Sequence, residues 1–526
     1  MIRRRESIHA NSVLTWAARC WNRAAAGSWT RCTQIPGKVY LTGAGPGDPE
    51  LITLKARRVL ESADCILYDN LANPALLELA PEHAERLYVG KKKSAHAFPQ
   101  EEIAAMLIKR AQAGKTVVRL KGGDPFLFGR GGEEAEALVE AGIPFEVIPG
   151  VTSMLGLAAY AGIPLTHREH SSSVTVVTGH EPESIDWTRT GLTDTLVVLM
   201  GLTSFGEIAR LLIAAGRPSE TPAAAVRWAT RPDQEILTGT LGTLPGLIAQ
   251  HGMKPPATIV VGEVAALGRR LNWFARLPLH GQRVVVTRPR EQSGSLAFAL
   301  RELGAHVTEL PAIEIRPAAD SGPLDRAIEK LEGYGWLIFT SANGVRYFID
   351  RLDRSDKDLS AIRGTVCAIG PATGCTLRSL HLKVRVMGDE FVAESLLEAL
   401  PGSMAGERVL IPRAAVARDV LPVGLQARGA VVDVVEAYRT EAPAGFPALA
   451  AAAVAQLQPR DWLTFTSSST VRNLVTAIGA ECIRNVRVAT IGPVTSATAR
   501  EFGIEVNTEA STYTSEGLVE AILRVG

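Results

Sequence analysis

Glycine and polar residues that suit ligand chemistry gather in two segments of the first half of the chain. Residues 43–48 read Gly-Ala-Gly-Pro-Gly-Asp, and residues 122–125 read Gly-Gly-Asp-Pro. The first segment has the spacing of a dinucleotide loop, except that Asp48 stands where the third glycine or alanine is expected. A carboxylate there would oppose a pyrophosphate. The pattern therefore favours a ligand without phosphate, which needs close approach of the backbone. S-adenosylmethionine is such a ligand.

Asp69 and Lys91 each directly follow an apolar run that reads as a strand. Structural interpretations stay open for both. Asp69 could cap a helix, and the basic run 91–93 could be a solvated face. His167 could be a structural histidine, and the segment 122–124 could be a plain turn.

The elements that must position these residues alternate between strands and helices, which predicts a mainly parallel α/β sheet. Polar and glycine residues follow the strands, where open α/β sheets bind ligands. A second α/β subdomain is expected past about residue 165, closing around Trp273. The expected strands of the first subdomain are 39–41, 65–68, 87–90, 116–120 and 145–148, and those of the second are 174–178, 195–199 and 257–261.

The second half of the chain contains an internal duplication. Four short motifs recur in the same order at offsets of 126, 122, 122 and 125 residues. The repeat predicts two similar α/β lobes that form a bilobal unit with a cleft. A linker between the halves is expected at 277–281. The recurring pairs are 339–341 with 465–467, 369–371 with 491–493, 394–398 with 516–520, and 281–284 with 406–409.

Composition indicates a globular protein with several cores. The 526 residues are 46% apolar and 21% charged, with a formal net charge of +1, so bulk charge does not argue for nucleic acid. No apolar run reaches the length of a membrane helix. The six cysteines form no Cys-x-x-Cys pair and no metal spacing, which predicts reduced cysteines, a cytoplasmic protein and no metal. Residues 1–36 are rich in arginine, and no function is assigned to them. They could be an extension, a misassigned start or a transit-like leader.

The first half resembles uroporphyrinogen-III C-methyltransferase, of the tetrapyrrole methylase family, over about residues 37–275. The motifs that carry the resemblance include Val-Tyr-Leu-Thr-Gly-Ala-Gly-Pro-Gly-Asp-Pro at 39–49, Arg-Leu-Lys-Gly-Gly-Asp-Pro-Phe at 119–126, Pro-Gly-Val-Thr-Ser at 149–153 and Gly-Ile-Pro-Leu-Thr-His-Arg at 162–168. The resemblance implies that S-adenosylmethionine is the methyl donor, with Asp69 as proton acceptor and Lys91 as proton donor. Ala229 departs from the family, which usually has glycine there. The implied cofactor-binding residues are Pro46, Gly122, Gly123, Asp124, Leu127, Thr152, Ser153, Met200 and Ala229.

The second half, about 281–526, resembles uroporphyrinogen-III synthase, through motifs that include Val-Thr-Arg-Pro at 286–289, Phe-Thr-Ser at 339–341 and 465–467, and Tyr-Arg-Thr at 438–440. The resemblance implies closure of linear hydroxymethylbilane into a ring. Tyr438 is the candidate to assist loss of hydroxide, because a phenol donates a hydrogen bond without a permanent charge. Its alternative is a plain strand tyrosine, and helix capping is the alternative for the candidate substrate-binding residues. Those residues are Ser341, Thr373, Ser467 and Thr495.

These patterns and resemblances together predict an α/β chain with a two-domain tetrapyrrole methylase unit followed by a bilobal, duplicated α/β synthase unit. The expected product is precorrin-2 for siroheme or cobalamin, with tetrapyrroles as ligands and a homodimer formed through the methyltransferase half. Alternatives are an inactive synthase half that only binds tetrapyrrole, a non-enzymatic tetrapyrrole carrier, a nicotinamide oxidoreductase fused to a solute-binding protein, and a siroheme synthase, whose additional dinucleotide motif is not found. The expected boundaries are 1–36 for the extension, 37–276 for the methyltransferase (subdomains about 37–165 and 166–276), and 281–526 for the synthase (lobes about 281–316 plus 440–526, and 317–439).

Overall fold

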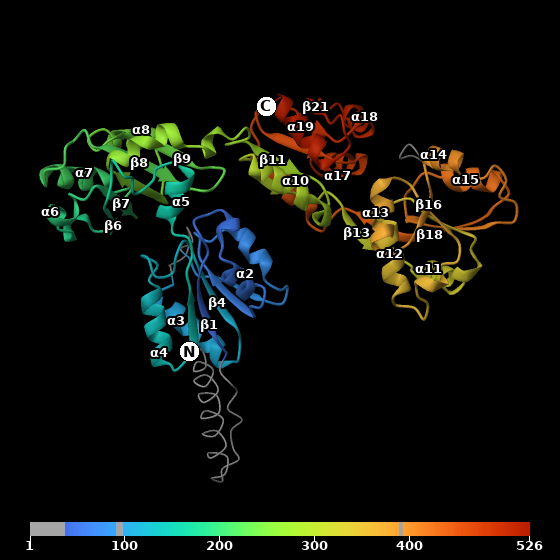
Figure 1. Cartoon of the computed structure of the whole chain (residues 1–526), viewed down its shortest axis with the longest axis horizontal. Helices are drawn as coiled ribbons and strands as arrows, with labels where there is room; N and C mark the ends of the chain where they lie inside the picture. Colours follow the sequence, from blue (N-terminus) through green and yellow to red (C-terminus); the bar gives the residue numbers. More distant parts are fainter. Residues whose placement is uncertain (1–36, 91–97, 389–392, 526) are drawn as a thin grey trace, which may run out of the picture. The chain divides into compact units, whose positions relative to one another are not determined.

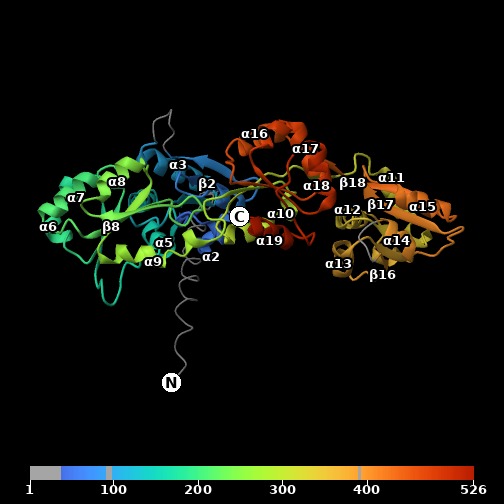
Figure 2. The same cartoon turned by 90° about the horizontal axis from the view of Figure 1, so that it is seen from above.

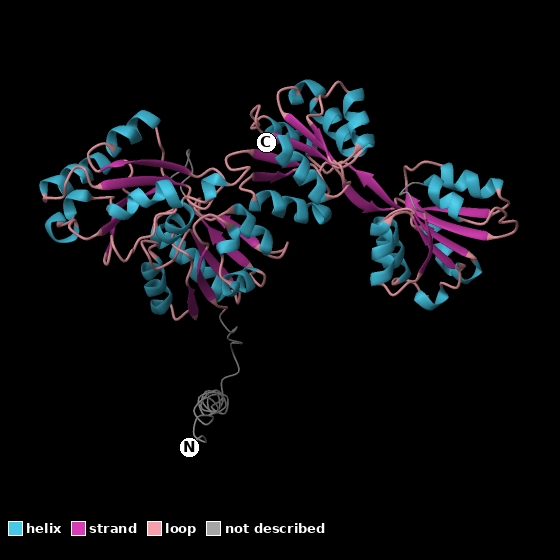
Figure 3. Ribbon diagram, turned by 45° about the horizontal axis from the view of Figure 1, so that its top comes forward, coloured by secondary structure: helices cyan, strands magenta, loops and turns pink. Residues whose placement is uncertain are grey.

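The computed structural model describes residues 37–90, 98–388 and 393–525. The chain divides into two compact units between Trp273 and Phe274 (Figure 1). Each unit contains two sheets covered by helices, so the predicted α/β class is confirmed (Figure 3). Among the described residues, no helix is both long and apolar enough to cross a bilayer.

The first sheet of unit 1 is wholly parallel, with strand order β3-β2-β4-β1-β5. Apolar side chains on its two faces form two separate buried clusters, as expected for a sheet covered by helices on both sides. Its strands are β1 (Val39–Gly43), β2 (Cys65–Tyr68), β3 (Glu85–Tyr88), β4 (Val117–Lys121) and β5 (Phe145–Ile148). The helices are α2 (Leu54–Leu60), α3 (Gln100–Gln112), α4 (Gly131–Glu140) and α5 (Ser153–Tyr160), with the 3-10 helices η1 (Pro49–Leu51) and η2 (Pro74–Leu79).

Strand β3 begins two residues before the expected 87–90 and ends at Tyr88, so the predicted bounds of this strand are wrong. The strand starts with the charged residues Glu85 and Arg86, and charged residues at this place predict a loop rather than a strand. Arg110 donates to both carboxylate oxygens of Glu85, at 3.0 and 2.7 Å, and this pairing lets an acidic residue start a strand.

The second sheet of unit 1 is mixed, with order β6-β7-β10-β8-β9. β6 and β7 are parallel, whereas β10 runs antiparallel to both of its neighbours and β8 pairs antiparallel with β9. The strands are β6 (Val174–Thr178), β7 (Thr195–Leu199), β8 (Pro222–Arg227), β9 (Glu235–Thr240) and β10 (Ala257–Val261). The helices are α6 (Trp187–Thr190), α7 (Phe205–Ala214), α8 (Leu244–His251) and α9 (Gly268–Leu271).

The two sheets of unit 2 show the predicted duplication in their strand order. One sheet has the order β12-β11-β19-β20-β21, and the other has β18-β17-β14-β15-β16 with β13 added antiparallel at its edge. Each strand of the first order corresponds to the strand at the same place in the second. The strands are β11 (Arg283–Val286), β12 (His306–Glu309), β19 (Trp462–Phe465), β20 (Arg487–Thr490) and β21 (Thr508–Glu509), then β13 (Glu314–Pro317), β14 (Trp336–Phe339), β15 (Thr365–Ala368), β16 (Val384–Met387), β17 (Arg408–Ala414) and β18 (Val431–Glu441).

The helices of unit 2 repeat in the same way, and Figure 2 labels those around each sheet. The sheet that holds β11 is built from both ends of the unit, because the chain leaves it after β12 and returns at α16. Its helices are α10 (Arg290–Glu302), α16 (Phe446–Val454), α17 (Ser468–Ile478), α18 (Pro493–Glu501) and α19 (Ser515–Val525). Those of the other sheet are α11 (Gly322–Glu329), α12 (Ala342–Leu352), α13 (Pro371–Ser379), α14 (Ala393–Ala399) and α15 (Val420–Ala427).

Candidate functional site

The glycine segments predicted to bind the cofactor meet at the carboxyl end of the parallel sheet. The loop after β1 and the loop after β4 are joined by a two-residue bridge between Gly45 and Gly123. Gly123 N donates to Gly45 O at 2.7 Å, and Gly45 N donates to Gly123 O at 3.3 Å. Both glycines have positive φ, +78° and +66°, which explains the residue type at each position.

Other glycines of this edge are required because backbones touch. A Cβ on Gly43 would lie 2.5 Å from Gly150 Cα, and a Cβ on Gly122 would lie 2.4 Å from the Cβ of Leu71. The loops after β1, β2, β4 and β5 are therefore packed backbone against backbone. This is the close approach that the sequence pattern suggested.

Asp124 fastens two of these loops together. Its Oδ1 accepts hydrogen bonds from the amides of Phe126 and Leu127, at 2.8 and 3.1 Å, and its Oδ2 accepts one from Gly150 N at 3.0 Å. The carboxylate is thus engaged with the backbone of its own loop and of the loop after β5. Asp124 shapes the site, and Leu127 is held in it through its backbone.

A loop from the second sheet reaches the glycine loop after β1. Asp48 N donates to Thr230 Oγ1 at 2.9 Å, and the carbonyl oxygen of Ala229 lies 3.2 Å from where a Cβ of Gly47 would be. Pro46 packs on Gly156 of α5, whose added Cβ would lie 2.6 Å from it. Ala229 itself is buried, so its departure from glycine is accommodated.

Backbone strain accumulates in these loops. In the described part of unit 1, five non-glycine residues have φ between +49° and +74°, which costs about 1–3 kcal/mol each. Strain of this kind is retained where function demands a particular backbone. Predicted Met200 is among them, and its side chain is 55% exposed, while Thr152 and Ser153 lie at the start of α5. The five residues are Phe128, Arg130, Met200, Trp228 and Thr230.

Asp69 lies just after β2 and caps a turn. Its Oδ1 accepts from Leu71 N at 3.1 Å, and its Oδ2 lies 3.3 Å from Nη2 of Arg119. The helix-capping alternative is wrong for Asp69, because η2 is capped by Asn73. Lys91, the predicted proton donor, lies outside the described residues.

A buried ion cluster, which no sequence pattern had predicted, contacts Asp69 through Arg119. The side chains of Arg119, Lys121 and Glu134 are 5%, 5% and 0% exposed. Glu134 Oε1 accepts from Arg119 Nε at 3.1 Å, from Lys121 Nζ at 2.9 Å and from Gln100 Nε2 at 2.8 Å. Burial, followed by the neighbouring Arg119, lowers the pKa of Lys121. The available signal was two charged residues, Arg119 and Lys121, in the otherwise apolar strand β4.

His167, Glu169 and His170 form an exposed turn whose ligand atoms lie within 4.8 Å of one another. Such a set has the chemistry of a transition-metal site. However, Nδ1 of His167 accepts a hydrogen bond from Glu169 N at 3.2 Å. A metal on Nε2 would require a proton on Nδ1 and would break that bond.

The loops at the carboxyl end of the parallel sheet fit S-adenosylmethionine because they offer backbone hydrogen-bonding groups. The fit does not depend on a charged side chain. The described residues around Gly45 and Gly123 offer mostly backbone amides and carbonyls. Both carboxylates of the two glycine segments are already engaged, because Asp48 accepts from Glu50 N and from the Tyr160 hydroxyl, each at 2.9 Å. A phosphate-free ligand with polar ends suits such a surface.

In unit 2, the predicted serines take equivalent places in the two repeats. Ser341 begins α12 and accepts from Gly344 N, and Ser467 begins α17 and accepts from Thr470 N. Both therefore cap helices, as the alternative interpretation stated. Thr373 and Thr495 lie in the first turns of α13 and α18 and are buried.

Tyr438 lies on β18 and is 8% exposed. Its hydroxyl is 3.0 Å from Ser341 Oγ, and its ring stacks on Tyr347 at 5.9 Å between centroids. The contact brings together two of the residues predicted for this half. The hydroxyl of Tyr438 thus has an ordered partner through which a proton can be shared.

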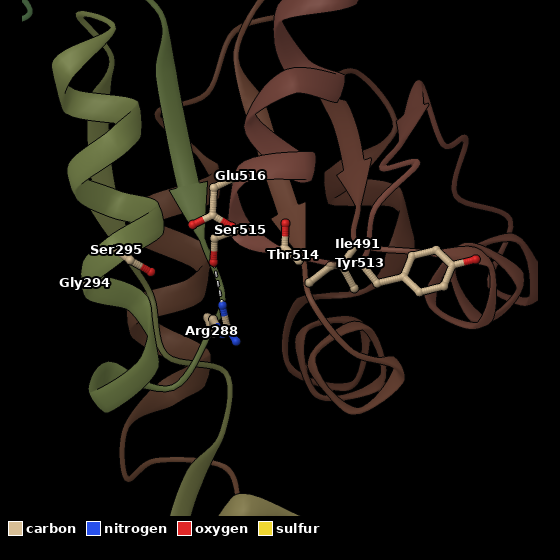
Figure 4. A pocket seen from close by; sticks show the side chains of 8 residues that line it. All are labelled: Arg288, Gly294, Ser295, Ile491, Tyr513, Thr514, Ser515 and Glu516. Carbon is tan, nitrogen blue, oxygen red and sulfur yellow. Dashed lines mark hydrogen bonds between the residues drawn. The ribbon is translucent and has the colours of Figure 1, made fainter. Parts of the chain in front are cut away.

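A cavity of about 540 Å³ at the carboxyl end of β11 was not predicted as a site (Figure 4). Arg288 lies on it and donates from Nη1 to Ser515 Oγ at 2.9 Å. The motif at 286–289 contained this arginine, but a motif does not show whether its side chain lines a cavity.

Comparison with known proteins finds two family models in the chain. Residues 38–245 match the family of tetrapyrrole (corrin/porphyrin) methylases, and residues 294–520 match uroporphyrinogen-III synthase HemD. Among solved structures, the chain is similar to uroporphyrin-III C-methyltransferase of Thermus thermophilus complexed with S-adenosylhomocysteine. The identity is 43% and the TM-score 0.39, over 44% of this chain and all of that one. Uroporphyrinogen-III synthase of Thermus thermophilus matches at 18% identity and a TM-score of 0.38, over 46% of this chain and 98% of that one.

Two relatives differ in how far the similarity extends. The siroheme synthase of Chromobacterium violaceum is 53% identical over 258 residues, which is 48% of this chain and 54% of that protein. The chain thus spans about half the length of such siroheme synthases. The porphyrin biosynthesis protein HemD of Ruminiclostridium josui is 37% identical over 498 residues, covering 93% of this chain and 98% of that protein. The chain therefore belongs to the family of porphyrin biosynthesis enzymes in which a tetrapyrrole methylase domain precedes a uroporphyrinogen-III synthase domain.

Proposed function

We propose that this protein cyclises hydroxymethylbilane to uroporphyrinogen III and methylates that product twice with S-adenosylmethionine to give precorrin-2. The observation that carries the proposal is the match of a tetrapyrrole methylase model to residues 38–245 and of a uroporphyrinogen-III synthase model to residues 294–520. The alignment with the Ruminiclostridium josui protein, over 93% of this chain, supports it. The product of the second domain is the substrate of the first. Precorrin-2 then serves siroheme or cobalamin formation, and the methylase half forms a homodimer.

In the methylase half, S-adenosylmethionine supplies an electrophilic methyl group when it is bound. Pro46, the glycines at 122 and 123, and the loop shaped by Asp124 hold it through backbone groups. Asp69 accepts the proton that the methylated ring carbon loses, and Arg119 holds the Asp69 carboxylate in position. Lys91 completes the set as proton donor. Alignment of the two reactants contributes most to such a reaction.

In the synthase half, the chain's own residues bind and fold a linear substrate. Tyr438 donates its hydroxyl hydrogen toward the departing hydroxide, while Ser341 keeps the phenol oriented. Hydroxyl groups of the residues at 373, 467 and 495 bind carboxylates of the substrate.

The test is incubation of the purified full-length protein with hydroxymethylbilane, with and without S-adenosylmethionine. We expect uroporphyrinogen III when S-adenosylmethionine is absent and its dimethylated product when S-adenosylmethionine is present. The products are separated by chromatography and identified by mass spectrometry. The symmetrical type-I isomer alone, at the spontaneous rate, would contradict the synthase activity. A parallel incubation with uroporphyrinogen III tests the methylase by itself and identifies the case in which the synthase half only binds tetrapyrrole.

A further inference from the structure

The cavity at the carboxyl end of β11 is open to solvent and lined mostly by polar side chains. Its volume of about 540 Å³ lies within the roughly 300–1,000 Å³ that ligand pockets occupy. Its lining residues come from the segments 288–295 and 491–516, which lie far apart in the sequence but meet in the sheet that holds β11. Polar side chains on this lining are those of Arg288, Ser295, Tyr513, Thr514, Ser515 and Glu516 (Figure 4).

Arg288 is a cation with unused hydrogen-bonding capacity. A guanidinium has five N–H donors, and one of them is bonded to Ser515 Oγ. Among the side chains that the structure describes, which leave out those of residues 290–293, no acidic one forms an ion pair with Arg288. Burial lowers the pKa of Arg288, and the charge of Glu516 offsets this effect only in part. A carboxylate entering the cavity would bring a further negative charge within hydrogen-bond reach of the guanidinium.

The duplication supplies an internal comparison. Arg413 follows Arg288 by 125 residues, the same offset that relates the sequence of β11 to that of β17. Arg413 Nη2 donates to Asp419 Oδ1 at 2.6 Å, and its Nη1 donates to the Arg418 carbonyl at 3.0 Å. The protein thus provides a carboxylate for the arginine in one repeat, whereas the equivalent arginine in the other repeat faces a cavity.

We propose that Arg288 binds a carboxylate side chain of the tetrapyrrole substrate in this cavity, with the hydroxyls of Thr514 and Ser515 as additional donors. The inference rests on the proposed cyclisation activity of unit 2. Hydroxymethylbilane carries an acetate and a propionate on each pyrrole, and a guanidinium fork matches a carboxylate with two parallel hydrogen bonds. Arg288 is thus a binding residue that determines specificity for a carboxylated substrate.

The test compares Arg288→Gln, Arg288→Lys and the control Arg301→Gln in the full-length protein. Arg301 lies on α10, is 47% exposed and pairs with Glu309. We expect Arg288→Gln to raise KM for hydroxymethylbilane about tenfold to a hundredfold, the range for loss of a charge-assisted hydrogen bond, with kcat little changed. Arg288→Lys should recover part of the loss, and the control should retain the wild-type KM.

A binding measurement separates recognition from turnover. Fluorescence titration with uroporphyrin III, which carries the same carboxylates on a stable ring, should show the same loss of affinity in Arg288→Gln, with a thermal midpoint close to wild type. A wild-type KM and affinity in Arg288→Gln would overturn this inference alone. No conversion of hydroxymethylbilane by the wild-type protein would overturn the proposed function and this inference with it.

Discussion

Replacing Glu134 with glutamine removes the acid of the buried ion cluster without changing its size. The carboxylate is 0% exposed and faces two cations. Among the described residues, its loss leaves Arg119 and Lys121 with the partly exposed Asp69 as their negative partner. Breaking a buried ion pair in this way costs about 3–5 kcal/mol. The contribution of Lys121 to this loss of folding free energy cannot exceed the cost of neutralising it, because the lysine can release its proton instead of staying unpaired. For an ordinary lysine that cost is about 4–5 kcal/mol at pH 7. Burial has already lowered the pKa of Lys121, so that route costs less here.

Scanning calorimetry of the full-length protein measures the effect. For a unit of this size, a loss of about 3–5 kcal/mol lowers the midpoint of its transition by about 6–20 °C. The matched control is Glu133→Gln, one residue away, whose carboxylate is 52% exposed and pairs with Arg130. That exposed pair contributes at most about 1 kcal/mol. Only the transition of unit 1 should move.

A second substitution and a change of pH test the reason for the loss. Lys121→Met added to Glu134→Gln removes one of the unpaired cations, and we expect it to recover stability relative to the single variant. The deficit of Glu134→Gln should also shrink between about pH 7 and pH 10, as Lys121 loses its proton. A deficit under about 1 kcal/mol, or a double variant no more stable than the single one, would refute the reasoning.

Four further outcomes are expected. Asp124→Ala should weaken S-adenosylmethionine binding in calorimetric titration, because three backbone amides lose their acceptor; wild-type affinity would remove Asp124 from the site. Asp69→Asn should slow methylation with cofactor affinity largely intact, and unchanged turnover would reject its role as proton acceptor. Tyr438→Phe should slow cyclisation and increase the share of the type-I isomer on chromatography; an unaltered rate and isomer ratio would argue against it. The hydrogen bond from Arg110 lowers the pKa of Glu85 to about 2, so this pair stabilises the fold above about pH 4.5 and loses its effect as pH falls toward 2. Glu85→Gln should therefore flatten the urea-unfolding stability profile between about pH 4.5 and 2, and an unchanged profile would show that the pair is neutral.

Five strands were predicted to the residue, from short runs rich in apolar and β-branched residues. The runs 65–68, 145–148, 174–178, 195–199 and 257–261 coincide with β2, β5, β6, β7 and β10. Their boundaries are marked by an abrupt change from apolar to polar or glycine residues. Where a charge starts a strand, as Glu85 does, the boundary depends on a partner that is distant in sequence.

The candidate site could be predicted as a set of loops but not as a set of contacts. Glycine spacing indicated the loops after β1 and β4, because close backbone approach requires that residue type. The engagement of Asp124 by amides of two loops depends on the sheet order, which places β5 beside β1. The cluster around Glu134 joins residues on β4 and α4 whose charges alone predict exposure, and only tertiary pairing makes their burial tolerable.

The path of the chain through unit 2 has a consequence for its synthesis on the ribosome. β11 pairs with β19, whose residues are made more than a hundred positions later, after the entire sheet that holds β17. At roughly 5–20 residues per second, the apolar strand Val284–Val286 waits on the order of ten seconds or more for that partner. The later sheet is continuous from β13 to β18 and can complete itself during this interval. β12 covers one edge of β11 soon after synthesis, whereas the other edge stays unpaired during this interval. That open edge is a site where a chaperone can bind and where aggregation can start when synthesis stalls.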